Sequence, residues 1–152
     1  MAIQIKDLEQ LKVMRRAGLL VGQTLQVLRE NIKAGMTTDA LDAIASANIK
    51  RGGGTSNFLG YHGYPKTICV SVNDEIVHGI PGPRILNDGD ILSIDCGAII
   101  DGWHGDAAFS IGVGNVDPED QKLMDTCEES MWVGIAAGKM GAKLSDIGHA
   151  IE

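Results

Sequence analysis

Apolar residues recur at steps of three and four between residues 6 and 33, which is the spacing of one face of an amphipathic helix. The positions on this face are Leu8, Leu11, Met14, Gly18, Val21, Leu25, Leu28 and Ile32. Gly35 follows, and glycine readily adopts the left-handed conformation in which helices commonly end. Thr37 or Thr38 can cap a second helix, which the glycines at 52–54 end. The pattern therefore predicts two helices in the first third of the chain.

In the middle of the chain the period changes to two. Residues 67–72 alternate apolar with small or polar side chains, which is typical of a strand buried on one face only. Residues 91–100 and 103–113 are two further strand-like runs. The dipeptide Asp101-Gly102 between them favours a tight turn. We therefore expect three strands, the last two of which form a hairpin.

Helical signals return near the end of the chain. An aspartate followed by a proline at residues 117–118 starts a helix that runs to about Lys139, and Ser145 can cap a shorter helix up to the last residue. A long helix, a glycine and a short helix thus occur twice, and Gly141 stands 106 residues after Gly35. The strands that follow the first copy have no counterpart after the second. We therefore expect an internal repeat whose second copy is cut short.

Asp95 and Asp106 are the first candidates for chemistry. If the hairpin turn has two residues, Asp95 faces Ala108 across the strands. Asp106 then lies on the same face as Asp95, at a backbone separation of about 7–8 Å. Carboxylates so placed repel one another and favour a divalent cation between them. Two solvated aspartates at strand ends remain the alternative, although the apolar neighbours of the pair favour a metal site.

Two histidines stand near these strands. His78 lies in residues 76–82, where glycine and proline predict a strand that opens into a rigid loop. There it could bind a substrate or donate to a developing oxyanion, and a histidine bonded to the backbone is the alternative. His104 has the parity of Asp106 and therefore shares its face. We favour a supporting role for His104 over direct metal ligation.

Aromatic residues gather in the loop before the first predicted strand. Tyr61 and Tyr64 are close together there, and Phe58 is near them. Their side chains could wall an apolar pocket, or they could pack as a lid over the core. The glycines at 52–54 are not a phosphate-binding loop, because no Gly-Lys-Ser or Gly-Lys-Thr follows them.

Composition narrows the possible classes of protein. A length of 152 residues suits one domain with a core, and a net charge of −7 argues against binding to nucleic acid. Residues 1–4 lead directly into the first helix without a secretory signal, and no apolar run is long enough to cross a membrane. The three cysteines form no CxxC pair, so neither a disulfide framework nor a zinc knuckle is indicated. We therefore expect a reducing, cytoplasmic setting.

Four segments, in this order, resemble the N-terminal half of bacterial type I methionine aminopeptidases: residues 61–66, 73–81, 88–90 and 94–106. The resemblance covers essentially the whole chain, and the lack of an N-terminal zinc-finger extension is similar to the bacterial form. It implies an α+β pita-bread fold, the fold of creatinase and these aminopeptidases. Two pseudo-symmetric halves there surround a curved antiparallel sheet with flanking helices. Residues 1–152 would form a single catalytic domain of this kind, incomplete at its C-terminus.

The same resemblance assigns roles to particular residues. By position, Asp95 matches a ligand of one metal ion, Asp106 matches the carboxylate that bridges two, and His78 matches a catalytic histidine that also binds the substrate beside the scissile bond. The wall of the methionine pocket would comprise Tyr61, Tyr64, Phe58 and Cys69. Phe58 departs from the cysteine that some relatives carry there. The implied cofactors are two divalent ions, for which cobalt, manganese, iron and zinc are all suitable.

The implied reaction is hydrolytic removal of the N-terminal methionine from nascent polypeptides near the ribosome, by a protein that is monomeric at full length. The two ions would share a water and lower its pKa toward about 7. The family's second half supplies one histidine and two glutamate ligands, which this sequence lacks, so we expect the chain by itself to be inactive. A non-catalytic form that binds peptides or partners, and a proline-directed aminopeptidase or prolidase, are the alternatives. Residues 61–66 favour the methionine enzyme.

Overall fold

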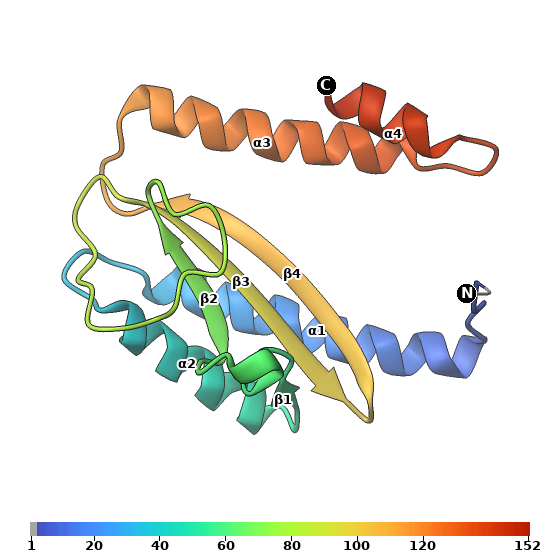
Figure 1. The fold of residues 1–152 in the computed structure, drawn as a ribbon, viewed down its shortest axis with the longest axis horizontal. Helices are drawn as coiled ribbons and strands as arrows, with labels where there is room; N and C mark the ends of the chain where they lie inside the picture. Colours follow the sequence, from blue (N-terminus) through green and yellow to red (C-terminus); the bar gives the residue numbers. More distant parts are fainter. Residues whose placement is uncertain (1–2) are drawn as a thin grey trace. The chain divides into compact units, whose positions relative to one another are not determined.

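The computed structural model describes residues 3–152, which form two compact units that meet between Asn115 and Val116. Met1 and Ala2, with which the argument against a secretory signal begins, lie outside the described residues. The first unit contains α1 (Leu8–Asn31), α2 (Thr38–Arg51), β1 (Thr55–Ser56), the short 3₁₀ helix η1 (Tyr61–Gly63), β2 (Ile68–Val72), β3 (Ile91–Ile100) and β4 (Trp103–Gly112) (Figure 1). The second unit contains α3 (Pro118–Ala137) and α4 (Leu144–Ile151).

The two predicted N-terminal helices are confirmed. Asp7 caps α1 through a reciprocal pair of hydrogen bonds with Gln10. Thr37, rather than Thr38, caps α2, because its hydroxyl accepts from the backbone N–H of Ala40 at 3.2 Å. The buried face of α1 is narrower than the sequence pattern predicts, since the side chain of Leu8 remains 75% exposed. Its buried residues are Ala17, Leu20, Val21, Thr24 and Leu28.

The long strand β3 organises the sheet of the first unit. It pairs with β4 on one edge and with β1 and β2 on the other, and every pairing is antiparallel. The predicted hairpin is confirmed: Asp101 and Gly102 have φ angles of 50° and 77°, as a tight two-residue turn between twisted strands requires. The register of β3 and β4 is therefore the one that the sequence predicts.

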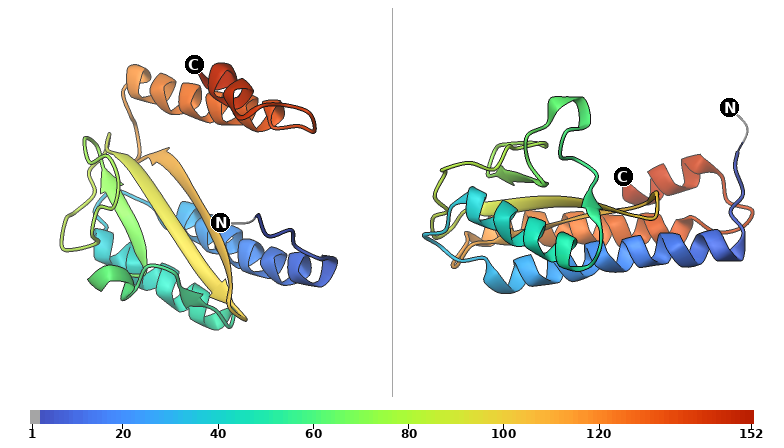
Figure 2. Two further views of the ribbon diagram at one scale, coloured as in Figure 1. Left: turned by 45° about the vertical axis from the view of Figure 1, so that its right-hand side comes forward. Right: turned by 90° about the horizontal axis from the view of Figure 1, so that it is seen from below.

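Helices α1 and α2 cover one face of this sheet, and the loops between β1 and β3 lie over the other face (Figure 2). The sheet and α1 approach each other closely at Gly105 of β4, where a Cβ atom would come within 2.6 Å of the backbone of Ala17 and Gly18. Only glycine permits this contact. Gly105 and Asp106 are neighbours in a strand and point to opposite faces, so Asp106 faces away from α1.

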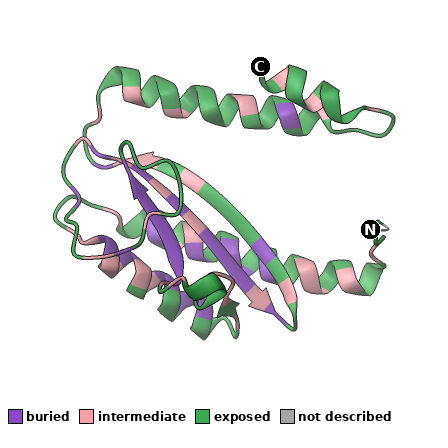
Figure 3. Cartoon of the chain, viewed as in Figure 1, coloured by how far each residue is buried: buried purple, intermediate pink, exposed green. Residues whose placement is uncertain are grey.

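The core lies between α1, α2 and the sheet. Its largest fully buried side chains include Leu28, Leu41, Ile49, Ile68, Leu86, Leu92 and Ile94. Strand β2 is buried along its whole length, so the prediction of a strand with one exposed face is wrong (Figure 3). The reason is tertiary: the helices cover one face, while the loops cover the other. The backbone N–H of Val70 donates to the carbonyl of Gly79 at 2.9 Å, which ties this loop to the edge of β2.

The segment before His78 also differs from its prediction. Residues 76–78 form no strand and lie in a loop, with the side chain of Ile76 90% exposed. The apolar run Ile76-Val77 indicates a strand only if a neighbouring strand is available to pair with it, and the free edge of β2 is bonded to Gly79 instead.

The second unit is a helical hairpin. Asp117 caps α3 by accepting from the N–H of Glu119 at 2.8 Å, as predicted. The predicted cap at Ser145 is wrong, because the N-cap of α4 is Lys143, two residues earlier. The connection between the helices contains Gly141 at φ 86°, and Gly35 between α1 and α2 has φ 87°. The predicted repeat is thus visible as two helix pairs, each with a left-handed glycine in its connection.

No helix among residues 3–152 is both long enough and apolar enough to cross a membrane.

Candidate active site

The hairpin places Asp95 and Asp106 on one face of the sheet, which we call the site face. Asp95 pairs with Ala108, and Asp106 pairs with Gly97, so the two acids are diagonal neighbours. Their carboxyl groups lie close enough for the charge of Asp106 to act on Asp95. This geometry is the one predicted from the two-residue turn, and neither acid points toward the helices.

The electrostatics of the pair follow from this placement. Burial raises the pKa of the Asp95 carboxyl, and the nearby charge of Asp106 raises it further. The His78 side chain partly offsets this effect, which places the imidazole within electrostatic range of Asp95. Two carboxyl groups that oppose each other's ionisation bind a proton or a cation more strongly than isolated ones. Oxygen donors of this kind suit a hard or borderline divalent metal ion.

Strand β2 brings Cys69 next to this pair, since Cys69 is the direct partner of Asp95 in the β2–β3 register. The thiol is buried, and burial is the main reason that its pKa is raised. The Tyr64 side chain lies near the thiol, and its ring meets that of Phe58 edge to face, with 6.4 Å between centroids. Three of the four predicted pocket residues are therefore contiguous.

Tyr61, the fourth predicted pocket residue, is placed differently. Its side chain is 67% exposed in η1, and its ring packs against the ring of His62 with centroids 4.4 Å apart. Among the described residues, the Tyr61 ring is not part of the group that Phe58, Tyr64 and Cys69 form.

His78 occupies an exposed loop on the same side as these residues. Its φ angle of 60° is unusual for a residue with a side chain. The next residue, Gly79, is held by its N–H, which donates to the Ser71 hydroxyl at 3.1 Å, and by its carbonyl, which accepts from Val70. A Cβ atom at Gly79 would lie 2.2 Å from the Val70 carbonyl oxygen, so the position requires glycine.

His104 pairs with Ile99 and lies on the site face two residues before Asp106, as its parity predicts. It is exposed. A supporting role for this residue stays a prediction.

Asn57 also belongs to the site face and is not among the candidate residues predicted from the sequence. Its backbone N–H donates to the Gly97 carbonyl, and its side-chain amide donates to the Gly105 carbonyl at 3.3 Å. The amide nitrogen lies 2.6 Å from the position that a Cβ of Gly97 would take, and the buried Oδ1 has no hydrogen-bond partner among residues 3–152. The glycine inside a strand at position 97 is the one sequence signal for such a close approach.

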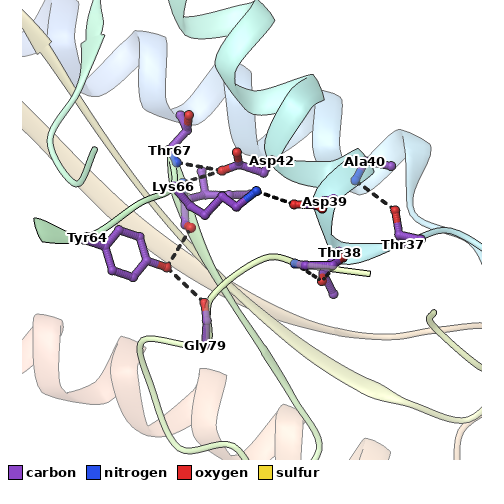
Figure 4. Close-up of polar contacts among 11 residues, drawn as sticks. Thr37, Thr38, Asp39, Ala40, Asp42, Tyr64, Lys66, Thr67 and Gly79 are labelled. Atoms are coloured by element: carbon purple, nitrogen blue, oxygen red, sulfur yellow. Dashed lines mark hydrogen bonds and ion pairs between the residues drawn. The ribbon is translucent and has the colours of Figure 1, made fainter. Parts of the chain in front are cut away.

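Contacts with the start of α2 hold the residues at the N-terminal end of β2 in place (Figure 4). The Asp42 carboxylate accepts from the backbone N–H groups of Thr67 and Ile68 at 2.7 and 3.1 Å. Lys66 forms an ion pair with Asp39 at 2.5 Å. These contacts set the position of β2, and with it that of Cys69. Sequence periodicity carries no signal for them, because the partners lie 25 to 27 residues apart.

A pocket of about 440 Å³ lies elsewhere, between β2, the start of α2 and the loop after His78. It is lined by Thr38, Val70, Val72, Glu75, Ile80, Gly82, Pro83 and Arg84. None of the predicted site residues lines it. We therefore place the candidate site at the acid pair and not in this pocket.

Among residues 3–152, no three His, Cys, Asp or Glu side chains are close enough together to hold one metal ion. Asp95 and Asp106 thus form a partial ligand set within this chain. Their carboxylate oxygens, and the unfavourable charge of the pair when nothing lies between them, fit a divalent cation that takes further ligands from elsewhere.

Residues 12–152 match the family model "Metallopeptidase family M24". The chain is 48% identical to methionine aminopeptidase 1 of Bacillus subtilis (strain 168) over 147 residues, or 97% of this chain and 59% of the relative. It is 43% identical to methionine aminopeptidase of Clostridium perfringens, with 99% and 60% covered. The chain thus spans about three-fifths of the length of these curated relatives.

Solved structures give the same result for the fold. The crystal structure of methionine aminopeptidase from Rickettsia prowazekii matches with a TM-score of 0.96 at 37% identity, covering 99% of this chain and 60% of that one. Prolidase from Pyrococcus furiosus matches with a TM-score of 0.82 at 17% identity, covering 97% and 42%, and shares the fold alone. The resemblance and the α+β pita-bread fold predicted from four sequence segments are confirmed.

Proposed function

Because the chain belongs to metallopeptidase family M24, we propose that the protein containing it removes the N-terminal methionine from nascent polypeptides by metal-dependent hydrolysis. The observation that carries this proposal is the acid pair: Asp95 and Asp106 are diagonal neighbours on one face of a hairpin, and the charge of Asp106 raises the pKa of Asp95. An uncompensated pair of this kind is costly to keep without a positive partner, so a binding role for a cation explains it.

Membership of this metallopeptidase family implies divalent metal. We propose two ions, of cobalt, manganese, iron or zinc, with Asp95 as a ligand of one and Asp106 as a bridge between both. When bound, such ions would supply a water acidic enough to act as a nucleophile near neutral pH. The remaining ligands would come from the part of the relatives' length that this chain does not span, and we expect the chain by itself to be inactive.

The chain's own residues would bind and orient the substrate. His78, on its exposed loop, would hold the carbonyl of the first residue and donate to the oxyanion that develops there. Phe58, Tyr64 and Cys69 would form an apolar wall for the methionine side chain, with Tyr61 at its exposed margin. The raised pKa of the Cys69 thiol keeps this wall uncharged at neutral pH, which suits a thioether ligand.

The setting of the protein is part of the same proposal. We propose that residues 1–152 belong to one catalytic domain, incomplete here, of a cytoplasmic protein. It would be monomeric at full length and would act on polypeptides near the ribosome. The net charge of −7 argues against nucleic acid as a binding partner.

The test is a comparison of two substrate classes. The complete protein, as encoded, is incubated with Mn²⁺ or Co²⁺ and either a Met-Gly peptide or an X-Pro peptide of equal length. We expect free methionine from the first and no cleavage of the second. Cleavage of the X-Pro peptide alone would indicate a proline-directed peptidase. Saturable binding of both peptides without turnover would indicate a non-catalytic binding protein.

A further inference from the structure

The hydroxyl of Tyr64 joins two segments that are far apart in the sequence. It lies 3.0 Å from the carbonyl oxygen of Ile68 and 3.0 Å from that of Gly79 (Figure 4). The first carbonyl belongs to the start of β2, and the second immediately follows His78. A single side chain of the proposed methionine pocket is thus bonded to the loop that carries the proposed catalytic histidine.

Gly79 is held at three points. Its N–H donates to Ser71, and its carbonyl oxygen accepts both from the N–H of Val70 at 2.9 Å and from the hydroxyl of Tyr64. The Tyr64 hydroxyl has one proton, which it shares between the carbonyl oxygens of Gly79 and Ile68. The Tyr64 hydroxyl is the only one of the three partners here that comes from outside β2. It therefore restrains the loop from a second direction.

His78 itself has few restraints. It is exposed, so packing does not fix its ring, and its φ angle of 60° belongs to a conformation that costs a residue with a side chain about 1–2 kcal/mol. Such a conformation persists only where the neighbouring backbone imposes it. The bonds to Gly79 impose it here. If one of them is lost, the peptide between His78 and Gly79 gains freedom to relax, and the direction of the imidazole changes.

Tyr64 is well placed to act as a restraint. Its ring is held edge to face against Phe58. Burial is the largest cause of a strongly raised pKa for the Tyr64 hydroxyl, so it stays protonated and able to donate across the whole working range of an enzyme. Ionisation of Tyr64 therefore does not remove its hydrogen bond to Gly79 in this range.

We propose that the Tyr64 hydroxyl is a positioning element for His78, and that it couples the methionine pocket to the catalytic loop. This inference rests on the proposed function, which gives His78 a role. Tyr64 would act through Gly79 on the direction of the imidazole, in addition to lining the pocket with its ring. A substrate methionine that packs against the Tyr64 ring would then contact the same residue whose hydroxyl holds the His78 loop.

The variant Tyr64→Phe separates the two roles, because it keeps the ring and removes the hydroxyl. In the complete protein with Mn²⁺ and a Met-Gly peptide, we expect kcat to fall about tenfold with KM within about twofold, as small misplacements of catalytic groups do. Asn31→Ala is the control: it removes a side-chain donor to a backbone carbonyl, at 2.8 Å, near the end of α1 on the other side of the sheet. It should leave kcat unchanged.

A double-mutant cycle shows whether Tyr64 acts through His78. In a His78→Ala background, Tyr64→Phe should change kcat less than twofold, since the group that it positions is gone. An equal loss of kcat in both backgrounds, or an unaltered kcat in Tyr64→Phe itself, would overturn the proposal.

Hydrogen exchange supplies a readout that needs no activity. The N–H of Val70 donates to the Gly79 carbonyl, so its exchange reports how often this loop opens. In Tyr64→Phe we expect the Val70 amide to exchange about tenfold faster, while the amide of Ile94 in β3 is unchanged. Unaltered exchange at Val70 would refute the restraint even if the complete protein proved to have no aminopeptidase activity. Absence of methionine release from the unsubstituted protein would refute the proposed function instead.

Discussion

Replacing Asp95 by Asn should stabilise the metal-free protein. The side chain of Asp95 keeps its size and its place in the β3–β4 register, but the repulsion from Asp106 is removed. Burial and this repulsion raise the pKa of Asp95, which means that the folded state opposes its ionisation. A raised carboxyl pKa is expected of a residue that binds metal at the expense of stability. The neutral residue of the same shape, here Asn, then gives the more stable folded protein when no metal is bound.

The magnitude follows from the register. Diagonal neighbours on one face of an antiparallel pair are separated by about 7 Å at the backbone. Two unit charges at roughly that distance repel by about 2 kcal/mol at an effective dielectric constant of about 20. Asp106 is exposed and His78 offsets part of the charge, so we halve the value. The expected gain in the free energy of unfolding is about 1 kcal/mol.

The assay is urea unfolding, followed by circular dichroism at pH 7.5 in EDTA and low salt. Asp74→Asn, which neutralises an exposed acid in the loop after β2, is the control and should change stability by less than about 0.5 kcal/mol. Screening by salt should shrink the gain for Asp95→Asn, because the repulsion between the partly exposed carboxylates falls with ionic strength.

The pH dependence has a definite sign. A carboxyl whose folded pKa is raised contributes stability below its unfolded pKa, and that contribution is lost as pH rises through the folded pKa. The advantage of Asp95→Asn should therefore vanish near pH 3 and grow toward neutrality. A variant that is less stable than the unsubstituted protein in EDTA at pH 7.5 would refute the charge-pair reasoning.

Three further predictions concern the scaffold and the metal. Gly105→Ala should lose about 1–3 kcal/mol in urea unfolding, because its Cβ would lie 2.6 Å from the backbone of Ala17; an unchanged midpoint would show that α1 can move aside. Asp90 is 8% exposed, and burial by itself would raise the pKa of its carboxyl group. Hydrogen bonds from Asn87 and Asn73 outweigh burial and lower this pKa, so Asp90→Asn should reduce the free energy of unfolding by about 1–3 kcal/mol at pH 7. Since a lowered folded pKa stabilises above the unfolded pKa and the benefit is lost as pH falls, the difference should shrink in unfolding curves measured below pH 4. Treatment of the complete protein with EDTA should stop release of methionine from a Met-Gly peptide, and added Mn²⁺ or Co²⁺ should restore it; turnover that survives dialysis against chelator would contradict a metal mechanism.

Local patterns predict the features that depend on neighbouring residues. The helix over residues 8–31 follows from apolar spacing, and the hairpin follows from Asp101-Gly102. Because the side-chain period of a strand is two, a turn of known length also fixes which residues share a face. The common face of Asp95 and Asp106 could therefore be predicted without any tertiary information.

Features that depend on distant segments could not be predicted in this way. The burial of β2 on both faces depends on loops that fold back over it, and the conformation of His78 depends on bonds that Gly79 makes with Ser71 and Tyr64. Periodicity describes a segment alone and carries no information on such partners. The same reason explains why Asn57 is absent from the sequence-based site: its position is defined by Gly97 and by a carbonyl 48 residues away.

The proposed role of the Asp106 carboxylate in metal-dependent hydrolysis is best tested by measuring turnover of a Met-Gly peptide by the Asp106→Asn variant. The complete protein is assayed with Mn²⁺ or Co²⁺ restored, beside the unsubstituted protein, after circular dichroism has shown that the variant is folded. We expect no methionine release above background, since an amide cannot replace the carboxylate with which Asp106 would hold the two proposed ions. Near-normal turnover by the folded variant with added metal would show that the Asp106 carboxylate is not required.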